Sequence, residues 1–339
     1  MIDLRSDTVT KPNELFLKEV LNAELGDDEY GEDPTVNKLQ NKCAEIFGFE
    51  DALFVTSGLM GNQISLMIHN KPGTEVITSS DSHIKNYEHG AASFLSRVQF
   101  REVNHIDGNL DLNEINTKYA KSKVHKPIIG SIAIENTHLA SGGSIINYED
   151  IKKLYDYASQ KGLKLHIDGA RIWHAILESN SSCNYGSVSD SLTFCFSKGL
   201  GAPIGSMLMG NKQFISEARK YRKILGGGMR QVGVLASIAN KALDCRDELL
   251  NDHIKAREVF DKIEKKDVFM DLVYKNTNMI IMKFFSSEKA NNFIASLKKH
   301  QILSGLIDDV SVRLVFHKDI NTEEISKISD AINYSSSEV

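Results

Sequence analysis

One lysine of this sequence lies where an amine could act as a nucleophile. Lys198 follows the apolar run of residues 191–196 and is flanked by Ser197 and Gly199. Desolvation at such a position favours the neutral amine, which attacks aldehydes to form a Schiff base. Small neighbours would let a planar ring approach the backbone. Taken alone, Lys198 is more simply interpreted as a solvated lysine at a strand end.

An aspartate and an arginine upstream change that interpretation. Asp168 ends the apolar run of residues 163–167, and Arg171 follows it closely. Open α/β sheets place their ligand sites at strand ends, where an aspartate can keep the pyridinium nitrogen of pyridoxal phosphate protonated. An arginine there can bind a carboxylate or phosphate through two parallel hydrogen bonds. Capping of a helix is the alternative role of Asp168. With Lys198, the pair predicts a pyridoxal-phosphate site.

Two further segments would complete such a site. Residues 54–62 are typical of a strand, a turn of small residues around Gly58 and a helix start, whose free N–H groups can bind phosphate. Such turns are common, so this one counts only beside the other residues. His83 follows the expected strand of residues 75–79, where an imidazole could lie flat on the cofactor or move protons near neutral pH. A hydrogen-bonded loop histidine is the alternative.

The composition limits the class of protein. The chain of 339 residues has a formal net charge of -5, which argues against a nucleic-acid binder because such proteins present a basic face. No stretch approaches the roughly 18 consecutive apolar residues of a membrane helix. The four cysteines lack metal-ligand spacing, so we expect reduced thiols and no metal site. These features predict a cytoplasmic protein that binds neither nucleic acid nor membrane.

The pattern of apolar residues indicates the elements that must position these side chains. Strands are expected at residues 52–56, 75–79, 97–103, 128–134, 163–167, 191–196 and 205–209, and helices at 35–47, 61–69, 112–122 and 148–161. Strands that alternate with helices build βαβ units. The sequence therefore predicts an α/β fold with a mostly parallel sheet flanked by helices.

The pattern changes after about residue 233. A long helix is expected over residues 234–265, followed by strands at 279–285 and 310–316 and helices at 288–300 and 322–334. A chain of this length usually forms two domains. We place the boundary inside the long helix, which gives a large domain of residues 1–250, N-terminal segment included, and a small C-terminal α+β domain of residues 251–339.

Several motifs, in order along nearly the whole chain, resemble one known family. They are residues 2–12 (IDLRSDTVTKP), 26–37 (GDDEYGEDPTVN), 134–138 (IENTH), 166–171 (HIDGAR), 196–200 (FSKGL), 225–231 (LGGGMRQ) and 312–319 (VRLVFHKD). The chain resembles the low-specificity L-threonine aldolases, in the β-eliminating lyase and threonine aldolase group of fold-type-I pyridoxal-phosphate enzymes. The resemblance implies the fold-type-I transferase-like architecture.

The resemblance also implies roles for the matching residues. Lys198 would hold pyridoxal 5'-phosphate as a Schiff base, Asp168 would pair with its ring nitrogen, and His83 would stack on its ring. The remaining implied roles are binding of the substrate carboxylate by Ser6, Arg171 and Arg313, phosphate contacts from Gly58, Leu59, Lys223 and Arg230, pocket walls from Tyr30 and Tyr87, and a second histidine near the substrate side chain, His125.

The implied reaction is cleavage of L-threonine or L-allo-threonine to glycine and an aldehyde, with His83 or His125 as the base. The implied assembly is a homotetramer, a dimer of dimers with shared active sites. Three positions depart from the family pattern: Leu59 replaces a threonine beside the phosphate, Leu139 a polar asparagine, and Asn86 a common aromatic residue. These changes put one phosphate hydrogen bond and the substrate preference in question.

Other reactions use the same set of residues. Transaminases, β-eliminating lyases and racemases also combine a lysine, an aspartate and a carboxylate-binding arginine. No basic cluster for a dicarboxylate side chain is evident, which disfavours a dicarboxylate transaminase. A histidine that reaches the substrate hydroxyl, without a second carboxylate pocket, favours the aldolase. A protein that only carried or sensed the cofactor would not need Ser6, Arg171 and Arg313, so these residues argue against that class.

Overall fold

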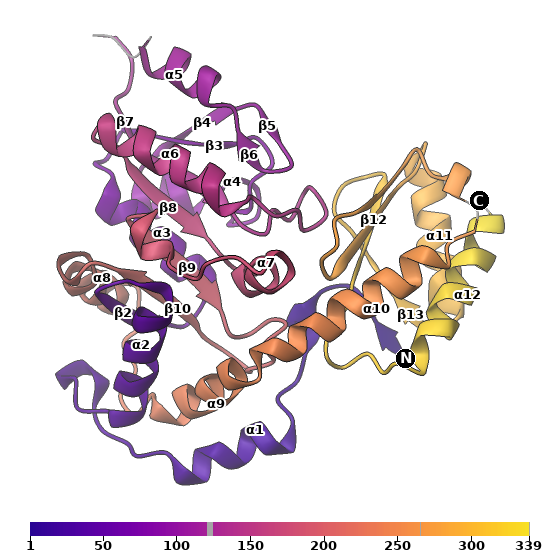
Figure 1. Ribbon diagram of the computed structural model, residues 1–339, viewed down its shortest axis with the longest axis horizontal. Helices are drawn as coiled ribbons and strands as arrows, with labels where there is room; N and C mark the ends of the chain where they lie inside the picture. The colour runs from indigo at the N-terminus through magenta and orange to yellow at the C-terminus, as the bar shows by residue number, and fades with distance from the viewer. Residues whose placement is uncertain (121–124, 265, 339) are drawn as a thin grey trace.

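The computed structural model describes residues 1–120, 125–264 and 266–338 (Figure 1). Among these residues, a seven-stranded sheet of order β2-β10-β9-β8-β7-β3-β4 forms the centre of the larger part. β10 runs antiparallel to both neighbours, and the other adjacent strands pair in parallel. The strands are β2 (Asp51–Val55), β3 (Glu75–Ser79), β4 (Gln99–Val103), β7 (Ile129–Glu135), β8 (Lys164–Asp168), β9 (Ser191–Cys195) and β10 (Ser206–Gly210).

Helices cover both faces of this sheet because successive side chains of a strand point to opposite sides. Phe54 of β2 packs in the largest apolar core, whereas its neighbours Leu53 and Val55 pack in a separate core with residues of α3 and α8. The helices of this part are α1 (Glu14–Lys18), α2 (Pro34–Phe47), α3 (Gly58–His69), α4 (His83–Asn86), α5 (Leu112–Ala120), α6 (Tyr148–Gln160), α7 (Ile172–Ser179), α8 (Lys212–Ile224) and α9 (Gly233–Asp244).

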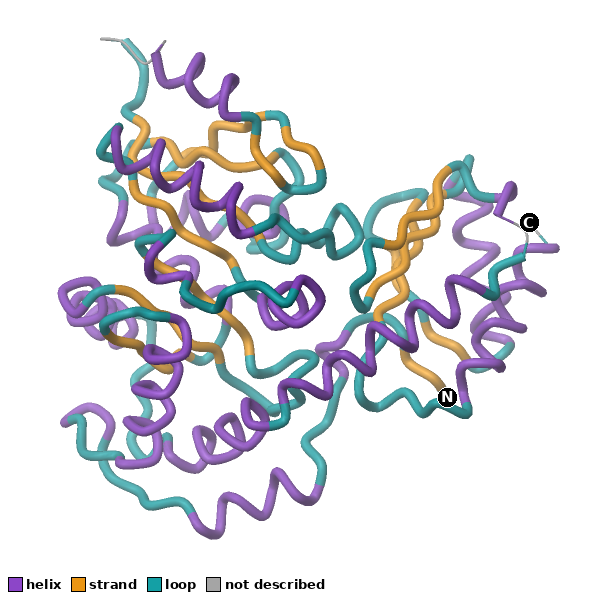
Figure 2. The backbone as a smooth tube through the Cα atoms, viewed as in Figure 1, coloured by secondary structure: helices purple, strands orange, loops and turns teal. Residues whose placement is uncertain are grey.

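A smaller antiparallel sheet of order β11-β12-β15-β14 lies beside the larger part, with α11 and α12 packed near it (Figure 2). A two-residue strand at the N-terminus, β1, pairs in parallel with β13, so both chain ends lie in this smaller part. Its elements are β1 (Ile2–Asp3), α10 (Leu249–Asp261), β11 (Asp271–Tyr274), β12 (Met279–Lys283), α11 (Ser287–Lys299), β13 (Ile302–Leu303), β14 (Gly305–Leu306), β15 (Ser311–Val315) and α12 (Glu324–Ser337).

The consecutive helices α9 and α10 connect the two parts. The expected single helix is wrong: α9 ends at Asp244, a 3-10 turn occupies Arg246–Glu248, and α10 begins at Leu249. Leu249 packs in the core of the larger part, whereas Val259 packs in that of the smaller part. The α10 helix therefore spans the two cores, and the division at residue 250 stays a prediction.

The predicted fold class is confirmed. The mostly parallel sheet and the small C-terminal α+β unit are both present. The short hairpin of β5 (His105–Ile106) and β6 (Asn109–Leu110) was not predicted. Within the described part of the chain, no helix has both the length and the apolar character needed to cross a bilayer.

Candidate active site

Parallel pairing brings the predicted chemistry to one edge of the large sheet. Asp168 ends β8 and Glu135 ends β7, and these two residues face each other in the strand register. His83 follows the end of β3, and Lys198 follows the end of β9. The carboxyl ends of parallel strands share one edge, so these side chains approach a common site.

Asp168 is almost completely buried at that edge. Its Oδ2 accepts a hydrogen bond from Asn62 Nδ2 at 2.8 Å, and its Oδ1 accepts one from the N–H of Ala170 at 3.1 Å. The N-cap of α7 is Arg171, so Asp168 does not cap that helix. The carboxylate instead faces His83, whose Nδ1 lies 3.8 Å from Oδ2.

His83 is held between several acidic groups. Its Nδ1 lies 3.4 Å from Oε1 of the buried Glu88, and its backbone N–H donates to Glu135 Oε2 at 2.8 Å. Burial alone would lower the pKa of His83, but the carboxyl groups of Glu88 and Asp168 outweigh it and raise the pKa above its usual value. The ring stacks on Tyr87 with centroids 5.7 Å apart, so its orientation is fixed.

The two arginines assigned to substrate differ in their partners. Arg171 donates two hydrogen bonds to the buried carboxylate of Asp7, at 2.8 and 2.6 Å. Burial would raise the pKa of Asp7, but Arg171 holds it well below its usual range. Arg313 donates from Nη2 to the carbonyl of Arg5 at 3.2 Å, and its buried Nε has no hydrogen-bond partner among the described residues.

Arg313 stays a cation although it is largely buried. Burial, together with the nearby Arg171 guanidinium, lowers its pKa to about 10, which is still far above neutral pH. An unpaired buried guanidinium is costly unless an anion binds to it. Arg313 therefore has the unsatisfied donor that a substrate carboxylate would meet.

Lys198 lies beside a small cavity. Its carbonyl accepts hydrogen bonds from Thr10 Oγ1 and from the N–H of Gly201, both at 2.8 Å, which fix the backbone. Its Nζ makes no hydrogen bond within the described residues, although its charge acts on both Asp7 and His83. The cavity is lined by Ala170, Arg171, Trp173, His174, Cys195, Lys198, Gly199, Leu200 and Leu249.

The first turn of α3 has the form of an anion cradle. Ser57 caps the helix by accepting the N–H of Met60 at 3.2 Å, and the N–H groups of Gly58 and Leu59 have no partner among the described residues. A Cβ on Gly58 would lie 2.8 Å from Cys195 Sγ, so only glycine lets the turn pack so closely. Free N–H groups and the helix dipole favour a phosphate here.

The sequence matches the model of one known family, described as beta-eliminating lyase, over residues 3–284. The chain belongs to the beta-eliminating lyase family. Low-specificity L-threonine aldolase 1 of Arabidopsis thaliana is 38% identical over 333 residues, which cover 96% of this chain and 93% of the relative. Low specificity L-threonine aldolase of Escherichia coli (strain K12) is 35% identical over 336 residues, 97% of each chain. These matches confirm the predicted family.

A solved structure supports the fold independently. The Leishmania major threonine aldolase superposes with a TM-score of 0.85 at 18% identity, and the match covers 99% of this chain and 100% of that one. At that identity the likeness concerns architecture alone. It confirms the predicted fold-type-I-like arrangement of a large α/β part and a smaller α+β part.

Three of the residues assigned to the site are not positioned beside Lys198. His125 is exposed in the turn before β7, at the opposite end of that strand from Glu135. Tyr30 is 77% exposed, and Arg230 pairs with Asp27 at 3.1 Å. The implied roles of His125, Tyr30 and Arg230 stay predictions.

Other assigned residues lie close to the site or to its phosphate cradle. Tyr87 stacks on His83, and Ser6 Oγ donates to Asp7 Oδ1 at 3.4 Å. Lys223 pairs with Glu29. The loop after Lys223 lies against the first turn of α3, because a Cβ on Gly227 would be 2.6 Å from Met60 Sδ.

Four residues of the site had no predicted role. They are Asp7, Asn62, Glu88 and Glu135, which hold Arg171, Asp168 and His83 in place. Asp7 and Glu135 lie within matched motifs, which was the only sequence signal for them. A buried ion pair or amide bridge joins residues far apart in the chain, so spacing along the sequence does not reveal it.

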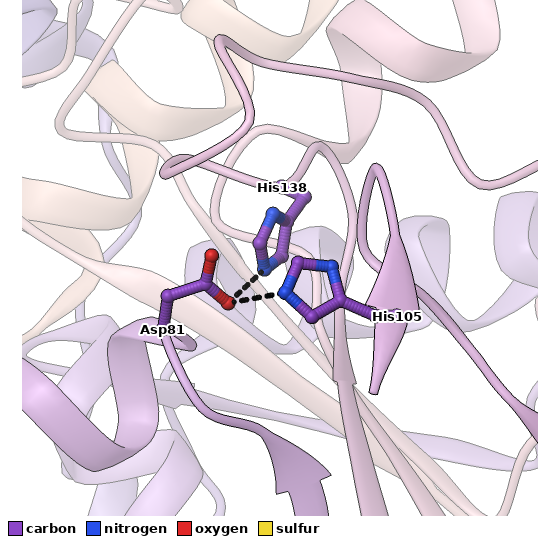
Figure 3. Close-up of side chains that lie close together, drawn as sticks. All are labelled: Asp81, His105 and His138. Atoms are coloured by element: carbon purple, nitrogen blue, oxygen red, sulfur yellow. Dashed lines mark ion pairs between the residues drawn. The ribbon is translucent and has the colours of Figure 1, made fainter. Parts of the chain in front are cut away.

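A separate cluster joins Asp81, His105 and His138 (Figure 3). Nε2 of His105 lies 2.9 Å from Asp81 Oδ1 and Nε2 of His138 3.4 Å from it, an arrangement that could hold a metal ion. However, the N–H of Gly108 donates to His105 Nδ1 at 3.0 Å, so a neutral His105 carries its proton on Nε2, facing Asp81. These contacts of Asp81 tie the β5–β6 hairpin to the turn that precedes α4, the helix that begins at His83.

The residues present fit pyridoxal phosphate. The Gly58–Leu59 N–H groups suit its phosphate, the buried Asp168 suits its ring nitrogen, and the unpaired Lys198 amine suits its aldehyde. The orphan Nε of Arg313 then suits the carboxylate of an amino acid bound beside it.

Proposed function

We propose that this chain binds pyridoxal phosphate on Lys198 and cleaves L-threonine or L-allo-threonine to glycine and acetaldehyde. The observation that carries the proposal is the convergence of Asp168, His83 and Arg313 on the edge of the sheet where Lys198 lies. When bound, the cofactor would act as an electron sink for the bond broken at Cα. The threonine aldolases of Arabidopsis thaliana and Escherichia coli, which match nearly the whole chain, support the same assignment.

The arginines orient the substrate. Arg313 binds the substrate carboxylate through its unpaired Nε, and Arg171, fixed by Asp7, presents its remaining N–H groups beside it. Fixing the carboxylate would set the torsion about the Cα–N bond of the substrate and so select which bond at Cα breaks. Such orientation can contribute several kcal/mol, roughly 7–11 in the best intramolecular cases. Asp168 would pair with the ring nitrogen of the bound cofactor and keep it protonated.

His83 is the candidate base for the β-hydroxyl. Its Nδ1 faces Glu88 and Asp168, which leaves Nε2 for the substrate. The neighbouring carboxyl groups stabilise the imidazolium that forms when His83 accepts the hydroxyl proton. His125 is the alternative base, and its place at the far end of β7 means that it could serve only the site of a neighbouring subunit.

The proposed assembly is a homotetramer with shared sites. Its support is an exposed apolar N-terminal segment, in which Leu15, Leu17, Leu21 and Leu25 are each at least 48% exposed. Exposed apolar side chains gathered in one segment are typical of a protein interface. Lys223 and Arg230 would add phosphate contacts, some of them to the site of a neighbouring subunit. The four cysteines are free thiols, which supports a cytoplasmic location.

The reaction is tested by identifying the products. Purified protein loaded with pyridoxal phosphate is incubated with L-threonine and L-allo-threonine, and aldehyde, keto acid, ammonia and D-amino acid are measured in the same mixture. Equal amounts of glycine and acetaldehyde are expected. Keto acid would instead indicate elimination or transamination, and D-isomers without aldehyde would indicate racemisation. Cofactor binding without any turnover would favour a carrier or sensor.

A further inference from the structure

A continuous series of hydrogen bonds runs from Asp168 into the protein. Asn62 Nδ2 donates to Asp168 Oδ2 at 2.8 Å, and Asn62 Oδ1 lies 3.0 Å from His166 Nε2. His166 Nδ1 lies 2.8 Å from Ser191 Oγ, which lies 2.7 Å from His69 Nε2. Asn62 and His69 belong to α3, His166 to β8 and Ser191 to β9. The series therefore crosses between the helix and the sheet beneath it.

The direction of every bond in this series follows from the Asn62 amide. Its Nδ2 also donates to Glu88 Oε1 at 2.8 Å, so a flipped amide would point its oxygen at two carboxyl groups. Asn62 Oδ1 must therefore accept a hydrogen bond from His166 Nε2–H. A neutral imidazole carries one proton, so His166 Nδ1 accepts from the Ser191 hydroxyl, and Ser191 Oγ accepts from His69 Nε2.

Both histidines are neutral at physiological pH. Desolvation by burial lowers the pKa of His166 to about 4 and that of His69 to about 3. The direction of the bonds is therefore kept at neutral pH. Every donor from His69 onward points toward Asp168, and hydrogen bonds aligned in this way strengthen one another.

The series offsets an unfavourable charge arrangement at Asp168. Glu88 and Glu135 are buried close to it, and burial followed by the Asp168 charge raises the pKa of Glu135. The Asn62 amide lies between Asp168 and Glu88 and donates one hydrogen bond to each. A donor that is held in place by its own oxygen can stabilise the negative charge on Asp168 at little cost in reorganisation.

We propose that Asn62, His166, Ser191 and His69 are positioning residues that keep Asp168 oriented and negatively charged for the pyridinium nitrogen of the cofactor. The proposal rests on the cofactor part of the proposed function and does not depend on which reaction follows. His166 is its central member, since it joins the amide that contacts Asp168 to the hydroxyl behind it. Asp168, and the series behind it, would act on the cofactor through the ring nitrogen alone.

Because only the ring nitrogen is involved, a cofactor analogue without that nitrogen serves as the matched control ligand. The test measures the dissociation constants of pyridoxal phosphate and of 1-deazapyridoxal phosphate, which has carbon in place of the ring nitrogen. The protein is the cofactor-free full chain, and quenching of its one tryptophan, Trp173, reports binding. His166→Leu removes both hydrogen bonds of the imidazole. His166→Gln can donate to Asn62 and accept from Ser191, so it keeps the direction of the series.

His166→Leu should weaken pyridoxal-phosphate binding by about tenfold, the loss of roughly one hydrogen bond to a charged group, and leave the deaza analogue within about twofold. His166→Gln should restore most of the affinity. Equal weakening of both ligands by His166→Leu, or no weakening of either, would overturn the proposal. If His166→Leu does not fold, as judged by urea unfolding, Ser191→Ala breaks the same series one bond further out and must show the same ligand selectivity.

Failure of the proposed function gives a different result. A wild-type protein that does not bind pyridoxal phosphate would refute the proposed function at its first step. A wild-type protein that binds the cofactor but releases no aldehyde would refute only the reaction. In that case the ligand selectivity of His166→Leu would still decide the role of the series.

Discussion

The guanidinium of Arg171 donates from Nε to Asp7 Oδ2 at 2.8 Å and from Nη2 to Asp7 Oδ1 at 2.6 Å, in a pair that is almost wholly buried. Two of the five N–H groups of Arg171 are therefore committed to the fold. Arg313, its neighbour, keeps an orphan Nε. The two arginines that both match a carboxylate-binding role should thus fail in different ways when they are changed.

Asp7→Asn should destabilise the protein. Removing one partner of a buried ion pair leaves an uncompensated charge, which typically costs about 3–5 kcal/mol in the free energy of unfolding. Urea unfolding of the cofactor-free protein measures this cost. Asp3→Asn is the matched control, because the Asp3–Arg5 pair is solvent-exposed and should contribute about 0–1 kcal/mol. Equal losses in the two variants would contradict the structural role of the Asp7–Arg171 pair.

Arg313→Lys should impair the reaction and spare the fold. A lysine cannot reproduce the planar fork that orients a carboxylate, so we expect kcat/KM for L-allo-threonine to fall by about 100-fold or more, with kcat also reduced. The urea midpoint should stay close to that of the wild type. Arg5→Lys, at the exposed guanidinium nearby, serves as the control and should keep wild-type kinetics. A loss confined to stability would place Arg313 outside the substrate site.

Leu59→Thr should tighten cofactor binding. The first turn of α3 offers two free N–H groups, and a threonine hydroxyl would add one hydrogen bond to a charged phosphate, worth about 1.5–3 kcal/mol. The dissociation constant of pyridoxal phosphate should therefore fall by roughly tenfold or more. Gly58→Ala should weaken the same equilibrium, because its Cβ would lie 2.8 Å from Cys195 Sγ. Adding Cys195→Ala to Gly58→Ala should recover part of the loss, and no recovery would argue against this contact as the cause.

Acid should destabilise the protein through its buried neutral histidines. The ordinary pKa of His166 is 6.5, and in the folded protein it is about 4. Between these values the unfolded chain binds a proton that the folded chain does not, so the free energy of unfolding falls as the pH drops. The contribution is about 1.4 kcal/mol per pH unit for this one group.

The difference between wild type and His166→Gln isolates that contribution. Asp252, whose burial raises its pKa to about 7, has the opposite pH dependence but is common to both proteins. Urea unfolding from pH 7 to pH 4 should show the wild type losing stability relative to the variant across this range. Parallel pH profiles would show that His166 is not held neutral in the folded protein.

The sequence predicted the fold well where apolar runs alternate. The bounds of β3 were predicted without error, and α2 and α6 differ from prediction by one residue at one end. The single helix of residues 234–265 failed because its apolar spacing continues through the 3-10 turn Arg246–Glu248. No proline or glycine marks that break, so a local pattern could not locate it.

The candidate site was predicted less completely. Asp168 and Lys198 could be placed because each follows an apolar run that proved to be a strand of the parallel sheet. Asp7 and Asn62 were not assigned, because their partners Arg171 and Asp168 lie far away in the sequence.

Binding of pyridoxal phosphate to Lys198 can be measured through the covalent bond that it would form. Protein incubated with pyridoxal phosphate is reduced with borohydride and digested, and the peptides are analysed by mass spectrometry. A phosphopyridoxyl group is expected on the peptide that contains Lys198, and none on that peptide in Lys198→Ala. Modification of another lysine at full occupancy, or of none, would contradict the assignment of Lys198.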